Sequence, residues 1–340
     1  MTRDRVLFCR ETLMELILAI LIGIIVYIIT VLIKYSVLDP LLLAIITGII
    51  IRTITGKKGN RASNLPSLIF IPFGIIFYAA KNLNFIKFAK VETGMIILLL
   101  VIILVYFTVI LILGKLLHQK KQITYLTATG SAICGASAIT ITSPAVEAEA
   151  DDVSISLLSV ALAAFVGLFV MLPFLGILFD ITNKVYCLLS ASVLQFTGFV
   201  KVAATSIHYL KTDIGREDLL SLALSVKAVK YLGLLIAIPL FASMTKKKLY
   251  IPWFLWAFLF SGIIFTWVYS VNKIFYEYMI NFIEPVYNIS WSIAMASIGL
   301  NADTRALLSN NGTKALVMAF AGFIAATGTF FAGLYIMHLF

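Results

Sequence analysis

Lys227 and Lys230 are the residues whose type and spacing point most directly to chemistry. Both lie in the apolar stretch 219–243, three residues apart, so a helix places them on one face near its middle. A lysine at the centre of a membrane helix costs about 2.5 kcal/mol or more unless it meets water or a partner. Two alternatives stay open. The lysines reach a helix end or pair with backbone carbonyls, or they bind an anion or act as gating charges.

Residues 127–144, TATGSAICGASAITITSP, form a second unusual stretch. It carries no charge and is long enough to cross a bilayer, yet it is rich in glycine and hydroxyl side chains. Such a segment either packs tightly against another helix or unwinds beside a cavity, as the interrupted helices of secondary transporters do. The residues that we expect to bind a solute or to permit unwinding here are Gly130, Ser131, Cys134, Gly135 and Ser137.

Residues 288–301, NISWSIAMASIGLN, form a second polar stretch. Ser297, Gly299 and Asn301 are its candidate site residues. We expect this helix to be interrupted as well, and to cross the first near the middle of the membrane.

The composition shows what kind of protein positions these residues. Of 340 residues, 61% are hydrophobic and 12% are charged, which is typical of an integral membrane protein and excludes a soluble domain. The net charge of +10 is spread over short clusters between apolar runs, so it indicates membrane topology and no nucleic-acid partner. Three cysteines make no disulfide framework, and neither metal-ligand spacing nor an enzyme motif is present.

Spacing of the apolar runs predicts an all-α polytopic protein with about eleven transmembrane helices. The predicted segments are 13–33, 40–54, 66–80, 94–117, 123–143, 153–179, 185–204, 219–243, 251–271, 282–300 and 313–339.

An internal repeat follows when the first segment is set aside. The next five segments and the last five share a similar spacing, and five is odd, so the two sets enter the membrane from opposite sides. We therefore expect an additional N-terminal helix (1–36) and two inverted five-helix repeats (37–181 and 182–340). A two-to-one excess of basic residues places the N-terminus in the cytoplasm and the C-terminus outside, with the acidic run 147–152 also outside.

Several motifs resemble a known family. GSAICGASAI (130–139), VKAVKYLGLLIAIPL (226–240), IPWF (251–254) and MASIGLN (295–301) resemble the bacterial and archaeal sulfate-exporter family, the YeiH-like membrane proteins. That family is similar to the cation/proton-antiporter and bile-acid-symporter group. The resemblance implies inverted five-helix repeats, two crossing discontinuous helices and an elevator-like movement. The chain departs from the family pattern at VLQFTGFVKVAA (193–204), where a His-Glu or similarly polar motif is common, and at Lys230, where arginine is common.

These observations predict a transporter of a small anion, sulfate or an organosulfonate, that works by alternating access in the cell membrane. Lys227 and Lys230 contact the anion, and Ser131, Ser137 and Ser297 donate hydrogen bonds. No Asp or Glu lies near the middle of a predicted segment, which argues against cation exchange. The alternatives are a sodium- or proton-coupled organic-acid carrier and a sensor or assembly subunit without transport. We expect a second copy of the chain as a partner and no cofactor.

Overall fold

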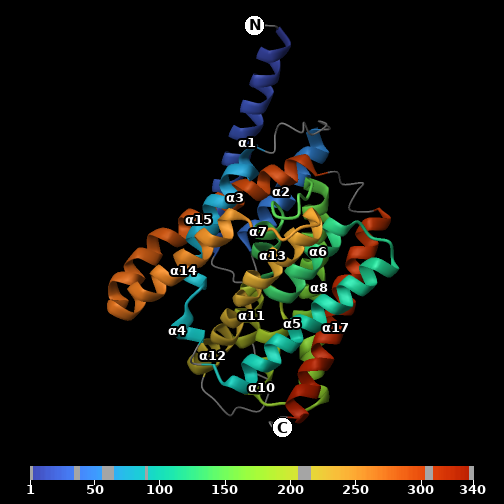
Figure 1. Ribbon diagram of the computed structural model, residues 1–340, viewed down its shortest axis with the longest axis vertical. Coiled ribbons are helices and arrows are strands. Elements are labelled where there is room, and N and C mark those ends of the chain that lie inside the picture. The colour runs from blue at the N-terminus through green and yellow to red at the C-terminus, as the bar shows by residue number, and fades with distance from the viewer. Residues whose placement is uncertain are drawn as a thin grey trace.

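In the computed structural model, the described residues are 3–33, 39–55, 65–88, 91–205, 216–302 and 309–336, and every element among them is a helix (Figure 1). In chain order the elements are α1 (Arg3–Ile33), α2 (Pro40–Thr55), α3 (Leu65–Asn82), α4 (Phe85–Phe88), α5 (Thr93–Leu116), α6 (Lys121–Thr129), η2 (Gly130–Cys134), α7 (Ala136–Thr142), α8 (Ala150–Val166), η3 (Gly167–Met171), α9 (Leu172–Leu178), α10 (Asn183–Val193), α11 (Thr197–Thr205), α12 (Arg216–Val229), η4 (Lys230–Leu232), α13 (Gly233–Lys246), α14 (Trp253–Val271), α15 (Lys273–Asn301) and α17 (Asn310–Ile336).

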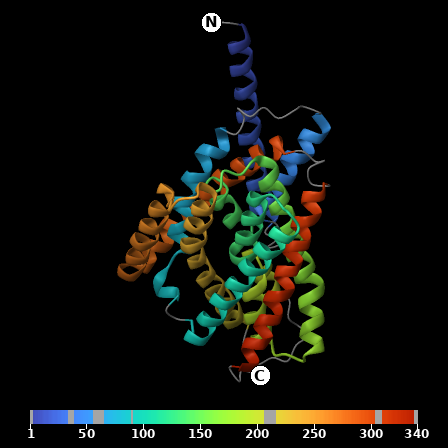
Figure 2. The same cartoon turned by 45° about the vertical axis from the view of Figure 1, so that its right-hand side comes forward.

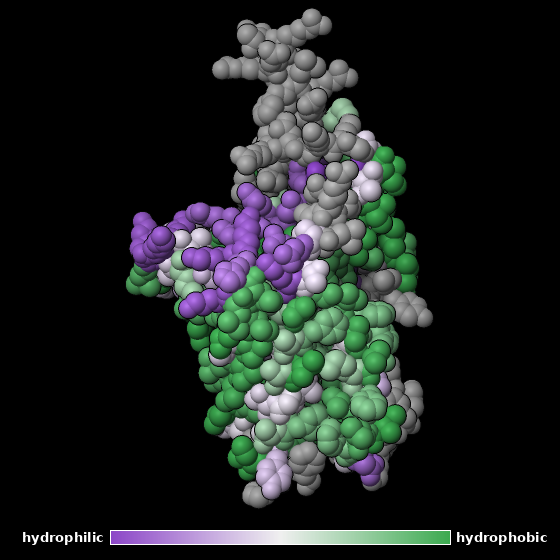
Figure 3. All heavy atoms as spheres, turned by 90° about the vertical axis from the view of Figure 1, so that its right-hand side faces the viewer, coloured by the Kyte–Doolittle hydropathy of each residue, from purple (hydrophilic) through white to green (hydrophobic). Residues whose placement is uncertain are grey.

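The protein is a polytopic membrane protein, as its composition predicts. Each of the eleven predicted segments coincides with one helix or with consecutive helices. Within the described residues, six helical spans are long and apolar enough to cross a membrane: Met14–Ile33, Thr93–Leu116, Ala150–Leu178, Asp218–Lys246, Trp253–Val271 and Asn310–Ile336. The face in Figure 3 is mostly apolar, and its hydrophilic residues gather toward the end nearer the N-terminal helix.

Helix α15 is continuous from Lys273 to Asn301, so the predicted interruption near Gly299 is wrong. Gly299 instead lets α15 approach α2. A Cβ atom at Gly299 would collide with the carbonyl oxygen of Ile45, and one at Gly48 would lie 2.6 Å from that of Ala296. Glycine here serves close packing between two membrane helices rather than unwinding.

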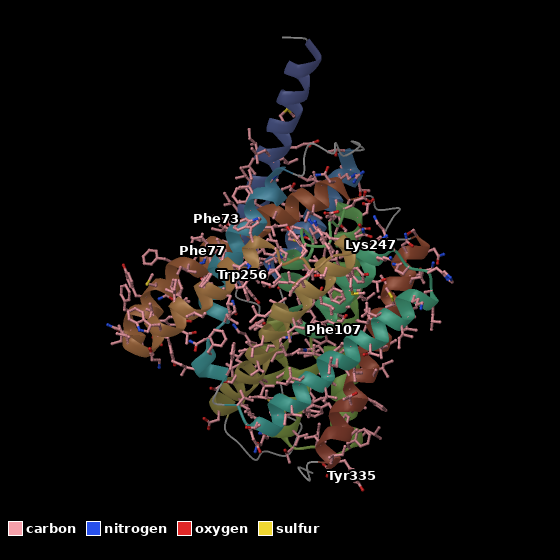
Figure 4. The ribbon with its side chains drawn as sticks, viewed as in Figure 1. Phe73, Phe77, Phe107, Lys247, Trp256 and Tyr335 are labelled. Carbon is pink, nitrogen blue, oxygen red and sulfur yellow. The ribbon has the colours of Figure 1, made fainter. Side chains whose placement is uncertain are left out.

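Helices α1 and α3 also pack along α15, and α14 packs along α3. Figure 2 shows the pair α14 and α15 projecting to the left of the other helices, as it does in Figure 1. Phe73 and Phe77 of α3 lie on this side of the molecule together with Trp256 of α14 (Figure 4), and the two phenylalanine rings are 4.9 Å apart.

Segment 123–143 does not cross the membrane. Lys120, which precedes α6, forms ion pairs of 2.8 Å with Glu149 and 2.9 Å with Asp152, where α8 begins. The chain therefore enters through α6 and η2 and returns through α7 to the same end of the molecule. We call α6, η2 and α7 hairpin A. The basic-residue bias also predicted Lys120 inside, across the membrane from the acidic run 147–152. That prediction is wrong, because hairpin A turns back where a spanning helix would continue.

The same ion pairs affect the titration of Lys120. Burial lowers the pKa of this ammonium group, and the hydrogen bonds and charges of Glu149 and Asp152 outweigh that effect, so the pKa lies above its ordinary value. Lys246 at the end of α13 lies 3.5 Å from Glu147, which brings a further basic residue to this end.

Segment 185–204 is also interrupted. α10 ends at Val193 and α11 begins at Thr197; the two helices pack against each other, and both pack along α12. The chain therefore turns back at residues 194–196. We call α10 and α11 hairpin B. The two interrupted segments are thus hairpins A and B, whereas the sequence predicted the second interruption in 288–301.

The two ends of the chain lie at opposite ends of the molecule (Figure 1). Helix α5 runs toward the end that carries Lys120, and α17 runs antiparallel beside it, with the Gln119 amide donating to the carbonyl of Asn311 at 2.8 Å. In Figure 4, Lys247 lies in the half nearer the N-terminus and Tyr335 lies at the C-terminal end.

Candidate solute site at the turns of two hairpins

The turn of hairpin A depends on Gly135. The π-helical η2 ends with the N–H of Gly135 donating to the carbonyl of Gly130 at 2.9 Å, and Gly135 then adopts φ 64° and ψ −121°. Residues other than glycine rarely adopt these backbone angles. A Cβ atom would also lie 2.9 Å from the ring of Phe196 in hairpin B. The turns of the two hairpins therefore touch at Gly135 and Phe196.

The turn of hairpin B exposes three consecutive carbonyl groups, and each accepts a hydrogen bond from a side chain on another element. Ser192 accepts from Lys230 at 2.8 Å, Val193 from the hydroxyl of Tyr106 at 2.8 Å, and Leu194 from Lys227 at 2.6 Å. A helix end leaves such carbonyls without intrahelical partners, and hydrocarbon offers no water to replace them. These side chains make the interruption possible inside a membrane.

Lys227 joins the two hairpins directly. Its Nζ also donates to the carbonyl of Ile133, next to the turn of hairpin A, at 2.8 Å. Lys227 and Lys230 are both fully buried. Positive charge is favourable at the C-terminal end of a helix, and here η2 and α10 both end beside these lysines. Of the two alternatives from the sequence, pairing with backbone carbonyls is therefore what the structure has.

A cavity of about 600 Å³ reaches both turns. Hairpin A contributes Cys134 and Ser137 to its wall, hairpin B contributes residues 196–199, and Lys227 bounds it between them. The cavity extends past the exposed residues Lys201 and Ser221, so it runs from the surface to the point where the hairpins meet. The last turn of α3 and residues of α15 form the facing wall.

Positive side chains outnumber negative ones among the described residues of the cavity wall. Three lysines line it, Lys81, Lys201 and Lys227, and two carboxylates, Asp39 and Glu284. Lys81 and Glu284 form an ion pair between α3 and α15, and both are about one third exposed. Asp39 accepts N–H groups at the start of α2.

Glu284 corrects an inference from the sequence. The predicted segment began at residue 282, which put Glu284 at a helix end. α15 begins at Lys273, where the side chain of Asn272 accepts the N–H of Phe275, so Glu284 lies near the middle of the helix. A carboxylate therefore lies on the cavity wall within α15, whereas the sequence reading put it at a helix end.

Aromatic rings make up much of the remaining wall. The ring of Tyr78 meets Tyr231 and Tyr287 edge to face, with centroids 5.7 and 5.5 Å away. The hydroxyl groups of Tyr231 and Thr197 are 2.9 Å apart. Phe196 also lines the cavity, and each of these four rings is 5% exposed or less. The aromatic surface is thus continuous with the turn of hairpin B.

The structure separates the residues that the sequence singled out. Lys227, Cys134 and Ser137 line the cavity, and Gly135 forms the adjacent turn. The remaining candidates do not line it. Lys230 lies beside the cavity on the carbonyl of Ser192, Gly130 and Ser131 are buried within hairpin A, and Ser297, Gly299 and Asn301 lie in the last turns of α15.

Three residues that matter here were missed by the sequence reading: Tyr106, Tyr78 and Glu284. Their roles depend on contacts between distant segments, and tyrosine is common in membrane proteins as an interface anchor. The signal that could have located hairpin B is Gln195, a fully buried polar residue whose amide donates to Tyr106 at 3.3 Å.

Comparison with known proteins places the chain among conserved membrane proteins. The UPF0324 membrane protein of Archaeoglobus fulgidus is 24% identical over 321 residues, which cover 92% of this chain and 90% of that protein. The UPF0324 membrane protein of Staphylococcus aureus (strain COL) is 28% identical over 264 residues, 74% of each chain. That of Bartonella henselae is 28% identical over 205 residues, 57% of this chain and 54% of the relative. No solved structure matches.

The family model described as Conserved hypothetical protein 698 matches residues 14–319, a span that includes both hairpins and every residue of the cavity wall. The chain therefore belongs to this family of membrane proteins.

Proposed function

We propose that the chain is a secondary transporter that moves a small anion across the cell membrane by alternating access. The observation that carries the proposal is the cavity of about 600 Å³ that leads from the surface to the meeting point of two helical hairpins. Non-helical backbone inside a membrane is tolerated where it is buried in protein or lines a water-filled cavity, and solute sites of transporters are built at such interruptions.

An anion is the solute that the charges favour. Lys227 lies at the inner end of the cavity and Lys201 at its exposed side, while Lys81 is paired with Glu284. Sulfate and organosulfonates are candidates because of the resemblance to the sulfate-exporter family. Ser137 and Thr197, one on each hairpin, supply hydroxyl groups to the solute.

The direction of opening follows from the proposed topology. With the N-terminus in the cytoplasm, the end that carries Lys120 is cytoplasmic. The cavity opens beside the first turns of α12, and α12 leads to α13, which ends at the Lys120 end. The cavity is therefore open to the outside in this state. Hairpins A and B enter from opposite sides, and an elevator-like movement would expose the site to the cytoplasm.

A second candidate, a proton- or sodium-coupled carrier of an organic acid, is favoured by Asp39 and Glu284. Intramembrane carboxylates are the usual groups that bind coupling cations. Transport driven by an imposed pH or sodium gradient would separate this candidate from uncoupled anion movement. A sensor without transport would bind an anion and give no flux in either case.

The proposal is tested by flux into proteoliposomes that contain the full chain, with labelled sulfate, small sulfonates and small carboxylates. Ser225 lines the cavity on α12 and is half-buried, so Ser225→Trp fills the cavity with little disturbance of the helices. We expect this variant to abolish flux. Ile236→Trp is the matched control, because Ile236 on α13 is 62% exposed and faces away from the protein core. Equal flux in both variants would refute transport through this cavity.

A further inference from the structure

The size of the cavity sets a first limit on the solute. Its volume of about 600 Å³ falls within the range of about 300–1,000 Å³ found for organic ligands. A water molecule occupies about 30 Å³ of liquid, and an inorganic oxyanion is only a few times larger. An oxyanion alone would leave most of the cavity wall without contact.

The wall itself is suited to an apolar body. Tyr78, Tyr231, Tyr287 and Phe196 present nearly buried rings to the cavity, and the rings of Tyr78, Tyr231 and Tyr287 form one edge-to-face cluster. Aromatic rings contribute large contact area and prefer edge-to-face or offset contact with other rings. This cluster reaches the turn of hairpin B through the contact of Tyr231 with Thr197. An anionic group near Lys227 would therefore have its attached body beside the rings.

The charged side chains on the wall limit the kind of anion that it can bind. Among the described residues, three lysines face two carboxylates on the wall, and the fully buried Lys230 lies beside it, so positive charge is in excess. None of the described residues on the wall is an arginine, the side chain that binds sulfate or phosphate oxygens in pairs. The wall therefore favours a single anionic group near Lys227 over an inorganic dianion, for which it offers no paired guanidinium donors.

We infer that the solute of this cavity is a monoanionic organic acid, a sulfonate or carboxylate with an apolar and preferably aromatic body, rather than inorganic sulfate. The inference rests on the proposed function, because it names the substrate class of the same site. It assigns Tyr287 as the residue whose ring determines this preference from α15, opposite the hairpins.

The experiment measures binding to the detergent-purified full chain by calorimetry, with four probes. Benzenesulfonate carries the charge and the ring, methanesulfonate carries the charge with a methyl group, sulfate is a dianion without a body, and benzyl alcohol is the ring without a charge. We expect benzenesulfonate to bind at least about tenfold more tightly than methanesulfonate, and sulfate and benzyl alcohol to bind most weakly. A tenfold change corresponds to 1.4 kcal/mol, within the range of one aromatic contact plus its buried area.

Two variants test the role of the ring. Tyr287→Leu should weaken benzenesulfonate about tenfold and leave methanesulfonate nearly unchanged, while Tyr287→Phe, which keeps the ring, should retain the preference. Tightest binding of sulfate, or equal loss for both sulfonates in Tyr287→Leu, would overturn the inference and leave anion transport standing. If none of the three anions binds, both the inference and the proposed anion site fail.

Discussion

Lys227 Nζ lies 2.6 Å from the carbonyl oxygen of Leu194, so a residue of α12 completes the hydrogen bonding of the turn in hairpin B. The same nitrogen serves the carbonyl of Ile133 in hairpin A. The pair of lysines that the sequence marks as a solute site therefore also holds two interrupted helices together. Its substitution affects folding as well as binding.

Lys227→Met should lower the thermal stability of the purified protein. The substitution leaves the carbonyls of Ile133 and Leu194 without a side-chain donor, and an unsatisfied buried polar group costs about 1–3 kcal/mol. Unfolding followed by intrinsic fluorescence in detergent measures the effect. Lys201→Met is the matched control, because Lys201 is exposed on α11 and should tolerate the change. Equal melting temperatures for the two variants would show that the stability of the hairpins does not depend on Lys227.

Gly135→Ala should destabilise the protein by about 1–3 kcal/mol, because alanine is strained at the φ and ψ of this turn and its Cβ would press on Phe196. Gly328→Ala on α17 is the control, since a Cβ atom there meets nothing within 4 Å. It should leave the free energy of unfolding unchanged or raise it slightly. Adding Phe196→Leu to Gly135→Ala should recover only the steric part. Full recovery would argue against backbone strain at Gly135.

Glu284→Gln should shift the binding preference toward dianions. The substitution removes one of two carboxylates and frees Lys81, so the wall gains one unit of positive charge. We expect the ratio of sulfate to benzenesulfonate affinity to rise severalfold, measured at constant ionic strength. Glu277→Gln is the control on the same helix, because Glu277 pairs with Lys273 at an exposed position outside the cavity wall. The same rise in Glu277→Gln would indicate a nonspecific charge effect. Stability should change little in either variant, since exposed pairs contribute about 0–1 kcal/mol.

Cys134 provides a direct measure of cavity occupancy. In a variant that keeps only this cysteine, a small membrane-permeant alkylating reagent should reach the thiol through the cavity and add one label per chain, detected by mass spectrometry. A bound anion should slow this reaction. Cys187 is fully buried and does not line the cavity, so a variant that keeps only Cys187 should remain unlabelled. Labelling of Cys134 at the same rate with and without a saturating anion would place the anion elsewhere.

Reporter fusions test the topology. With the two ends of the chain on opposite faces, a reporter that is active only in the cytoplasm should work at the N-terminus and fail at the C-terminus. A reporter inserted between Ala145 and Glu149 should also be active in the cytoplasm, because hairpin A returns to the side of Lys120. An inactive reporter at that insertion would instead support the spanning helix that the sequence predicted.

Sequence patterns were sufficient for the helices and for part of the site. Apolar runs predict where the helices lie. Two charges inside an apolar stretch identify Lys227 and Lys230 as candidate functional residues. The glycine-rich stretch locates the turn of hairpin A, because Gly135 is needed by the local backbone.

The turn of hairpin B could not be predicted in the same way. Residues 194–196 contain no glycine or proline. The carbonyls of residues 192–194, where α10 ends, are satisfied by Lys230, Tyr106 and Lys227, which are distant in sequence. In residues 288–301, glycine serves close packing between helices, a use that composition alone does not distinguish from unwinding.

The glycine contacts of α15 have a mechanical consequence. They pack α15 closely against α2 at Gly48 and against α1 at Gly23, while Lys227 links α12 to both hairpins. The cavity lies between these two groups of helices, and the ring of Tyr78 meets that of Tyr231 on its wall. Under the proposed function, the surface that would contact the body of the solute is therefore also the surface across which an elevator-like movement would have to occur.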